Sequence, residues 1–210
     1  NGYREAPVII KNELINGIGG GVCQVTTTLY VAVLKAMLEV VERTPHSLPL
    51  GYVPPGQDAT IAENSIDFKF KNNLSHPIFI GATASGGNLD ITIFGISENP
   101  DYSVRLRSKI LKVYKPESTL YITDNSVPPG VEIIEESPQN GYRAAVYRDI
   151  LDSNGNLVRT DFISEDDYKP VRGRIRVNES YFSEKEPSSE AVPSFVNSAS
   201  PGIDIVDTRP

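Results

Sequence analysis

The stretch GGGVCQVTTTLYVAVLKAMLEVVER, residues 19–43, decides the fold of the first half of the chain. Its three consecutive glycines interrupt any regular element before Val22. From there, apolar residues recur at the three-and-four spacing of a helix face, and a second apolar row runs beside the first. The pattern predicts one mostly buried helix over 23–43, roughly 20 residues and about 30 Å long. Pro45 is expected to end it.

The residues on either side of this helix favour strands. A β-prone segment over 6–14 predicts a hairpin whose turn falls near Asn12, and alternation over 66–71 predicts a half-buried strand. Two more apolar runs, 77–84 and 89–95, are joined by a Ser-Gly-Gly-Asn turn and predict a second hairpin. The first half is therefore expected to be a long buried helix packed on an antiparallel sheet.

The pattern changes after Asn99-Pro100-Asp101, and no helical period follows. Strand-like segments occur at 104–114, 120–123, 131–135, 142–151, 156–164 and 171–177, separated by glycine- and proline-rich turns. They predict an elongated all-β module. Beyond Ser180 the chain is rich in Ser, Glu and Pro, which predicts a flexible tail. The expected fold class is α+β, with domains at 1–98 and 103–178 and a tail at 179–210.

Composition excludes some classes of function. A net charge of −7 over 210 residues, with no basic stripe, argues against a nucleic-acid role. No apolar run approaches the length of a membrane span. The chain opens with Asn1 rather than methionine, so we expect any export signal or membrane anchor in a missing N-terminal region. One cysteine and two histidines without ligand spacing predict neither a metal site nor a cofactor.

Cys23 is the one cysteine of the chain and lies at the start of the predicted helix. The thiolate is the reactive form of cysteine, and the unpaired N–H groups and positive dipole at a helix N-terminus stabilise it. Glycines before the thiol would let a substrate carbonyl approach the main chain, and nearby backbone N–H groups would form an oxyanion hole. The expected oxyanion and substrate-binding residues are Gly20, Gly21, Gln24, Thr27 and Tyr30.

A catalytic cysteine also needs a base, and the base needs an acceptor that orients it. His46 follows the predicted helix, so it reaches Cys23 only if the proline-rich segment folds back along that helix. Asp58 is then the expected orienting carboxylate, and Glu63 is the other carboxylate of this loop. His76 is expected at the surface or in a turn. The predicted catalytic residues are thus Cys23, His46 and Asp58.

A non-catalytic interpretation stands beside this one. A single cysteine flanked by apolar residues is usually a small buried hydrophobe. The threonines at 26–28 can be polar residues of the first helical turns, and Tyr30 can belong to the core. On this interpretation Cys23 is inert and lies beside no cleft.

Several ordered motifs over about residues 1–97 closely resemble the VanW domain family. They are Gly19 to Tyr30, Glu39-Val40-Val41-Glu42-Arg43, Pro45-His46-Ser47, Tyr52-Val53-Pro54 and Gly56-Gln57-Asp58-Ala59-Thr60. The segment from Asn1 to Val8 resembles the middle of the family pattern, which implies a VanW domain without its N-terminal part. The family often has arginine before the aspartate. Gln57 stands there in this chain, so a charge that would orient Asp58 or a substrate carboxylate is expected to be missing.

Residues 104–177 resemble a G5 domain, a module of cell-surface proteins associated with N-acetylglucosamine-containing glycans. The likeness rests on Val127-Pro128-Pro129-Gly130 and on Ile163-Ser164 to Lys169-Pro170-Val171. Together the two resemblances imply an extracellular, cell-wall protein, with membrane anchoring left to the full-length chain. The implied partners are peptidoglycan stem peptides and glycan.

The VanW resemblance implies a specific activity for the cysteine. VanW proteins were named for their occurrence beside glycopeptide-resistance genes, and some members act as L,D-transpeptidases that form 3-3 peptidoglycan cross-links through the motif cysteine. By this resemblance Cys23 is the nucleophile. Hydrolysis and transfer both remain open, since either water or an acceptor amine can resolve a thioester. The competing hypothesis is a wall-binding or scaffolding protein that uses its G5-like module and carries a buried thiol.

Overall fold

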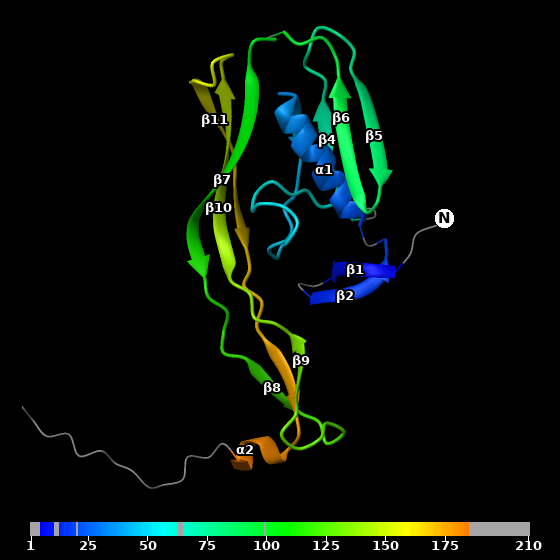
Figure 1. The fold of residues 1–210 in the computed structure, drawn as a ribbon, viewed down its shortest axis with the longest axis vertical. Helices are drawn as coiled ribbons and strands as arrows, with labels where there is room; N and C mark the ends of the chain where they lie inside the picture. Colours follow the sequence, from blue (N-terminus) through cyan, green and yellow to red (C-terminus); the bar gives the residue numbers. More distant parts are fainter. Residues whose placement is uncertain (1–4, 11–12, 20, 63–64, 99, 185–210) are drawn as a thin grey trace, which may run out of the picture.

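A computed structural model describes residues 5–10, 13–19, 21–62, 65–98 and 100–184 (Figure 1). Its first half contains β1 (Glu5–Ile10), β2 (Glu13–Ile18), α1 (Val22–Lys35), β3 (Glu39–Glu42), β4 (Lys69–Lys71), β5 (Phe79–Ser85) and β6 (Asn88–Phe94). The second half contains β7 (Ser103–Tyr114), β8 (Leu120–Thr123), β9 (Glu132–Glu136), β10 (Gly141–Leu151), β11 (Leu157–Tyr168), β12 (Arg174–Val177) and α2 (Ser180–Glu184).

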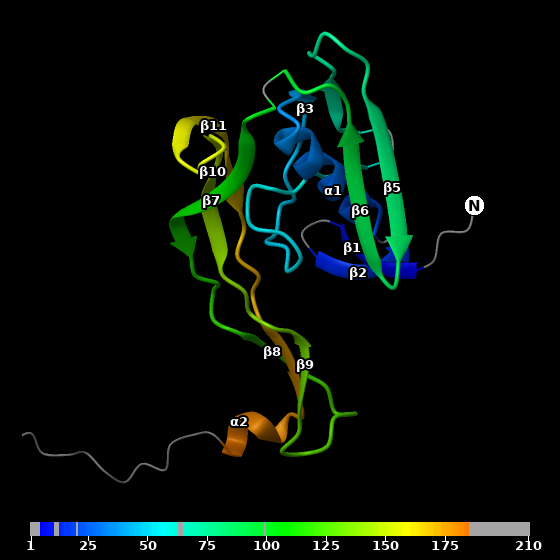
Figure 2. The same cartoon turned by 45° about the horizontal axis from the view of Figure 1, so that its top comes forward.

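Helix α1 lies between the β5–β6 hairpin and the sheet formed by β7, β10 and β11, as both views show (Figures 1 and 2). It packs against β6, β3 and β7. The buried centre of this packing is Tyr30, Leu34 and Ala59. Leu106 of β7 and Ile163 of β11 pack against the same centre. The hydrophobic core is therefore shared by the two halves of the chain.

The prediction of a long helix through residue 43 is wrong, because α1 ends at Lys35 after 14 residues. Met37 adopts a left-handed backbone conformation with φ of 58°. The Leu38 N–H bonds the Val33 carbonyl at 3.1 Å, and the Met37 N–H bonds the Leu34 carbonyl at 3.2 Å. These two bonds form a Schellman cap, in which the buried side chains of Val33 and Leu38 also meet the core. The helix therefore stops well before Pro45.

The residues after this cap form β3 rather than more helix. Val40 and Val41 are β-branched and suit a strand, and β3 pairs antiparallel with β4. The predicted single sheet of the first half is accordingly divided into separate two-stranded pairs, β1–β2, β3–β4 and β5–β6. Strands β1 and β2 confirm the first hairpin, while its turn at 11–12 lies outside the described residues.

The second half confirms the all-β prediction, with six strands at the expected places. They form two three-stranded sheets, ordered β11-β10-β7 and β8-β12-β9. The first sheet is antiparallel, and β8 runs parallel to β12 in the second. The predicted tail begins differently, because Ser180–Glu184 forms α2 and the Tyr181 ring stacks on Tyr121 at 5.1 Å. Residues 185–210 lie outside the described part.

The early end of α1 gives a stability prediction. Leu38 is 3% exposed, whereas Val41 is 60% exposed. We expect Leu38→Ala to lower the free energy of unfolding by about 2–4 kcal/mol and Val41→Ala to change it by less than about 0.5 kcal/mol, measured by urea denaturation. A helix continuing to residue 43 would place both side chains on one apolar row, so equal losses would contradict the cap at Met37.

Candidate functional site

Cys23 is the second residue of α1, and its surroundings follow from how the helix begins. Gly21 caps the helix with φ of 92°, a conformation that favours glycine. Val22 N–H bonds the Gly19 carbonyl and Val25 N–H bonds the Gly21 carbonyl. The amides of Cys23 and Gln24 therefore belong to the first turn, where no intrahelical acceptor exists. The half-buried thiol donates to the Ile61 carbonyl at 3.6 Å.

His46 and Asp58 form a tight buried pair beside this thiol. The Nδ1 atom of His46 lies 2.6 Å from Asp58 Oδ2, and the His46 backbone N–H donates to the same oxygen at 2.7 Å. Asp58 is 1% exposed and His46 is 7% exposed. Because Nδ1 faces the carboxylate, the other ring nitrogen is left to interact with Cys23. The return of the chain toward the helix start, on which the His46 hypothesis depends, is thus present.

Hydrogen bonding shifts the pKa values of the three groups toward an ion pair. The hydrogen bond with His46 holds the pKa of Cys23 below its ordinary value, against the opposing effect of burial. Burial lowers the pKa of His46, but hydrogen bonds with Asp58 and Cys23 outweigh it and raise that pKa to about 9. Burial likewise raises the Asp58 pKa, and the hydrogen bonds from His46 and Tyr168 bring it below its usual value. The arrangement favours a thiolate beside an imidazolium.

Two side chains that were not predicted from the sequence, Arg43 and Tyr168, contact Asp58, and a third, Asp166, contacts Arg43. Arg43 Nη2 donates to Asp58 Oδ1 at 3.1 Å, and its Nε donates to the Asp58 carbonyl at 2.6 Å. The Arg43 Nη1 atom lies 2.7 Å from both carboxylate oxygens of Asp166. The Tyr168 hydroxyl donates to Asp58 Oδ1 at 2.5 Å. These contacts join residues from both halves of the chain.

Arg43 is buried despite its charge, because its side chain is only 6% exposed. Its place also changes the interpretation of Gln57. The charge expected to be missing beside Asp58 is present, since Arg43 supplies it from the end of β3. Gln57 itself is buried and donates to Ser108 Oγ at 2.9 Å.

The predicted oxyanion and substrate-binding residues have different places. Gln24 and Gly21 are exposed at the start of α1. Thr27 is buried, and its hydroxyl exchanges hydrogen bonds with the backbone of Ala59 at 3.2 and 3.1 Å. Tyr30 is 1% exposed and lies in the core, with the Arg43 guanidinium 5.1 Å from its ring centre. Gly20 lies outside the described residues.

Thr27 and Tyr30 therefore hold the loop and Arg43 in place. The exposed positions, Gly21 and Gln24, are the ones that adjoin Cys23 on the solvent side. Asp166 and Tyr168 lie more than 100 residues further along the chain. One sequence signal could have pointed to them. Asp166 and Tyr168 alternate with Asp167 along a strand, so one face carries the carboxyl group of Asp166 beside Tyr168, and a buried carboxylate needs partners.

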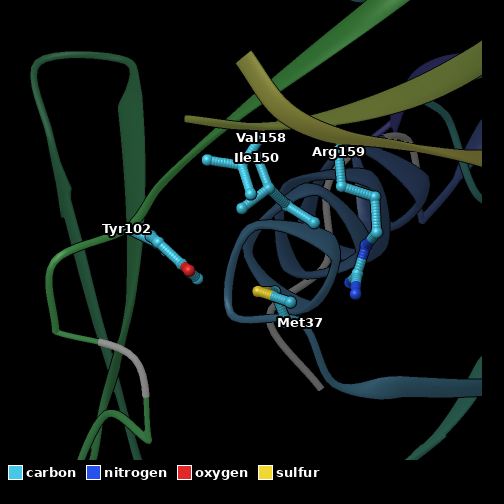
Figure 3. A pocket seen from close by; sticks show the side chains of 5 residues that line it. All are labelled: Met37, Tyr102, Ile150, Val158 and Arg159. Carbon is cyan, nitrogen blue, oxygen red and sulfur yellow. The ribbon is translucent and has the colours of Figure 1, made fainter. Parts of the chain in front are cut away.

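A separate cavity of about 300 Å³ lies at the other end of α1 (Figure 3). It is lined by Met37, Tyr102, Ile150, Val158 and Arg159. It does not contain the thiol or its partners. Within the described ranges, no cluster of His, Cys, Asp and Glu could hold a metal ion, and no helix is long and apolar enough to cross a membrane.

Comparison with known proteins matches the first part of the chain to a family. Residues 1–94 match the family described as VanW like protein. The chain is 41% identical over 119 residues to the uncharacterized protein YoaR of Bacillus subtilis (strain 168), a match that covers 57% of this chain and 37% of YoaR. The chain thus spans little more than a third of that relative.

Solved structures of two G5 domains are also similar to this chain. One is the G5 domain of HP0197, with 17% identity, a TM-score of 0.20, and coverage of 37% of this chain and 97% of that chain. The other is the G5 domain of IgA1 protease, with 8% identity, a TM-score of 0.23, and coverage of 39% and 96%. Because both TM-scores are below 0.5, these similarities say nothing about the site.

The loop that carries Asp58 gives a test of the site's geometry. Gly56 has φ of 87°, and a Cβ added there would collide with Val146, which is fully buried in β10. We expect Gly56→Ala to lower the free energy of unfolding by about 2–4 kcal/mol, from backbone strain and overpacking. It should also slow the alkylation of Cys23, because the displaced loop carries Asp58.

Gly51→Ala is the matched control, since a Cβ at Gly51 meets nothing within 4 Å. Denaturation and iodoacetamide labelling of both variants provide the measurement. Equal stability of the two variants would show that the loop does not depend on close contact with β10.

Proposed function

Residues 1–94 belong to the VanW-like protein family, and from that premise we propose that the chain is part of a cell-envelope protein in which Cys23 is an acyl-transfer nucleophile. VanW and G5 domains are both associated with the cell envelope. The proposed substrates are the stem peptides of peptidoglycan. The observation that carries the proposal is the buried His46–Asp58 pair, in which His46 also hydrogen-bonds Cys23 and lowers the thiol pKa.

In the proposed first step, the Cys23 thiolate attacks the carbonyl that joins the L-centre of a tetrapeptide stem to its terminal D-alanine. Negative charge then develops on the carbonyl oxygen, and the first-turn amides of Cys23 and Gln24 can donate to it. Collapse of this intermediate breaks the peptide bond. The leaving nitrogen takes the proton of the His46 imidazolium, and D-alanine departs to leave a thioester.

In the second step, an amine from a neighbouring stem attacks the thioester. His46, now neutral, accepts the proton of that amine, and Asp58 keeps the ring oriented and stabilises its charged form. The thiolate departs, and a 3-3 cross-link is complete. Water in place of the amine would give hydrolysis through the same groups, so the access of an acceptor decides between transfer and hydrolysis.

The pH dependence of this reaction follows from the two pKa shifts. The thiolate is required, and its pKa is lowered, so activity should rise with pH below the ordinary thiol range. The imidazolium is required too, and it is present below about pH 9 and lost above it. We expect a bell-shaped profile for acyl transfer, with its descending limb near pH 9, measured as D-alanine release from a stem tetrapeptide.

Alkylation of Cys23 by iodoacetamide isolates the ascending limb, because it requires only the thiolate. His46→Asn should move the alkylation profile toward the free-thiol value of about 8.5 and slow labelling at pH 7 roughly tenfold. His76→Asn is the matched control, since His76 is exposed and does not act on the pKa of Cys23. Identical profiles for the wild type and His46→Asn would contradict the proposed base.

A carbapenem tests the acyl-transfer chemistry directly. Its strained amide should acylate Cys23 in the same way as the stem peptide, so intact-mass spectrometry should show one adduct per chain. Cys23→Ala should abolish the adduct. If the native protein is not labelled and the adduct appears only after denaturation, Cys23 is a structural thiol. That result would favour the non-catalytic wall-binding alternative.

A further inference from the structure

We infer that Asp166 and Tyr168, two residues of β11, are positioning residues for the Cys23 site, so that the second half of the chain completes it. The inference rests on the proposed function, because it concerns the alignment of His46 and Asp58. Both residues lie outside the 1–94 segment that matches the VanW family. Both are buried on the same face of β11, while Asp167 between them is exposed.

Tyr168 acts through the loop that carries Asp58. Its hydroxyl accepts the Gly56 N–H at 2.6 Å and donates to Asp58 Oδ1. One oxygen atom thus ties the loop backbone to the carboxylate two residues later. The other carboxylate oxygen, Oδ2, is left to accept both hydrogen bonds from His46. Without this hydroxyl, a buried amide would lose its acceptor and the carboxylate would lose one of the donors that fix its rotation.

Asp166 acts through the charge of Arg43. Arg43 lies between two carboxylates, with its Nη1 atom 2.7 Å from both oxygens of Asp166 and its Nη2 atom 3.1 Å from Asp58. If Asp166 were neutral, the whole guanidinium charge would act on Asp58 and on the His46 imidazolium beyond it. Asp166 balances that charge, so Asp58 remains a strong acceptor for His46. Ser164 supports this carboxylate from the same face of β11, donating to Oδ2 at 3.0 Å.

Backbone contacts hold β11 against the same loop. The Lys169 N–H donates at 2.8 Å to the carbonyl of Ser47, the residue that directly follows His46. Gly56 and Val146 meet so closely that the loop can approach β10 only with glycine at that position. The loop that carries Asp58 is therefore in contact with β10 at Gly56, and the chain directly after β11 is bonded to Ser47. A displacement of the second half would change the alignment of the proposed base.

Tyr168→Phe in the 210-residue chain tests the inference, because it removes the hydroxyl and keeps the ring. Tyr114→Phe is the matched control. It removes a similar bond, in which the Tyr114 hydroxyl of β7 donates at 2.6 Å to Asp167 on the exposed face of β11. The readouts are the pH profile of Cys23 alkylation and the pKa of His46 by NMR. Only two histidines contribute imidazole signals, and His76→Asn assigns them.

In Tyr168→Phe we expect the carboxylate to lose its alignment and with it the short hydrogen bond to His46. This should slow alkylation at pH 7 about tenfold and lower the His46 pKa by about one unit, with Tyr114→Phe unchanged. Asp166→Asn should shift both readouts in the same direction, and it provides the test if Tyr168→Phe does not fold. Wild-type readouts decide the proposed function separately, since an ordinary thiol profile there would reject the catalytic cysteine itself. The wild type is expected to show an alkylation profile with a lowered thiol pKa. If folded Tyr168→Phe and Asp166→Asn show that same profile, only the positioning role is overturned.

Discussion

The structure depends on a carboxylate that has almost no contact with water. Asp58 is 1% exposed, and a buried charge of this kind is stable only when donors and counter-charges surround it. His46 supplies two hydrogen bonds, Tyr168 supplies one and Arg43 supplies one. These donors come from two distant parts of the sequence, residues 43–46 and Tyr168. Satisfying Asp58 therefore fixes how β3, the loop after it and β11 lie against one another.

The same requirement explains the path of the chain after α1. Arg43 can reach Asp58 and Asp166 only because the helix stops at the Met37 cap and β3 turns the chain back. The guanidinium then lies against the Tyr30 ring, which joins the charge network to the hydrophobic core. Helix length, charge pairing and core packing are thus linked at Arg43.

Much of the fold follows from the sequence, and the exceptions have physical causes. The period-2 segments after residue 100 predicted six strands, because alternation and turn residues are local signals. The apolar spacing over 22–41 fits a helix throughout, and only the left-handed backbone at Met37, an uncommon choice of residue, ends it. The predictions of Cys23, His46 and Asp58 used local chemistry and motif resemblance. Arg43, Asp166 and Tyr168 escaped because their roles depend on contacts between distant segments.

The free energy needed to bury these charged groups points to a role for them beside Cys23. A buried ion network is weak evidence for stability, since well-packed apolar side chains of similar volume are often as stable or more so. The six ionisable groups around the loop include a thiol, whose charged form would be poorly stabilised by an apolar core. An imidazolium held charged to about pH 9 by Asp58 provides that stabilisation. Under the proposed function, the buried charges are best explained by the need for a thiolate at the start of α1, and the β10–β11 sheet is the rigid support that keeps its partners aligned.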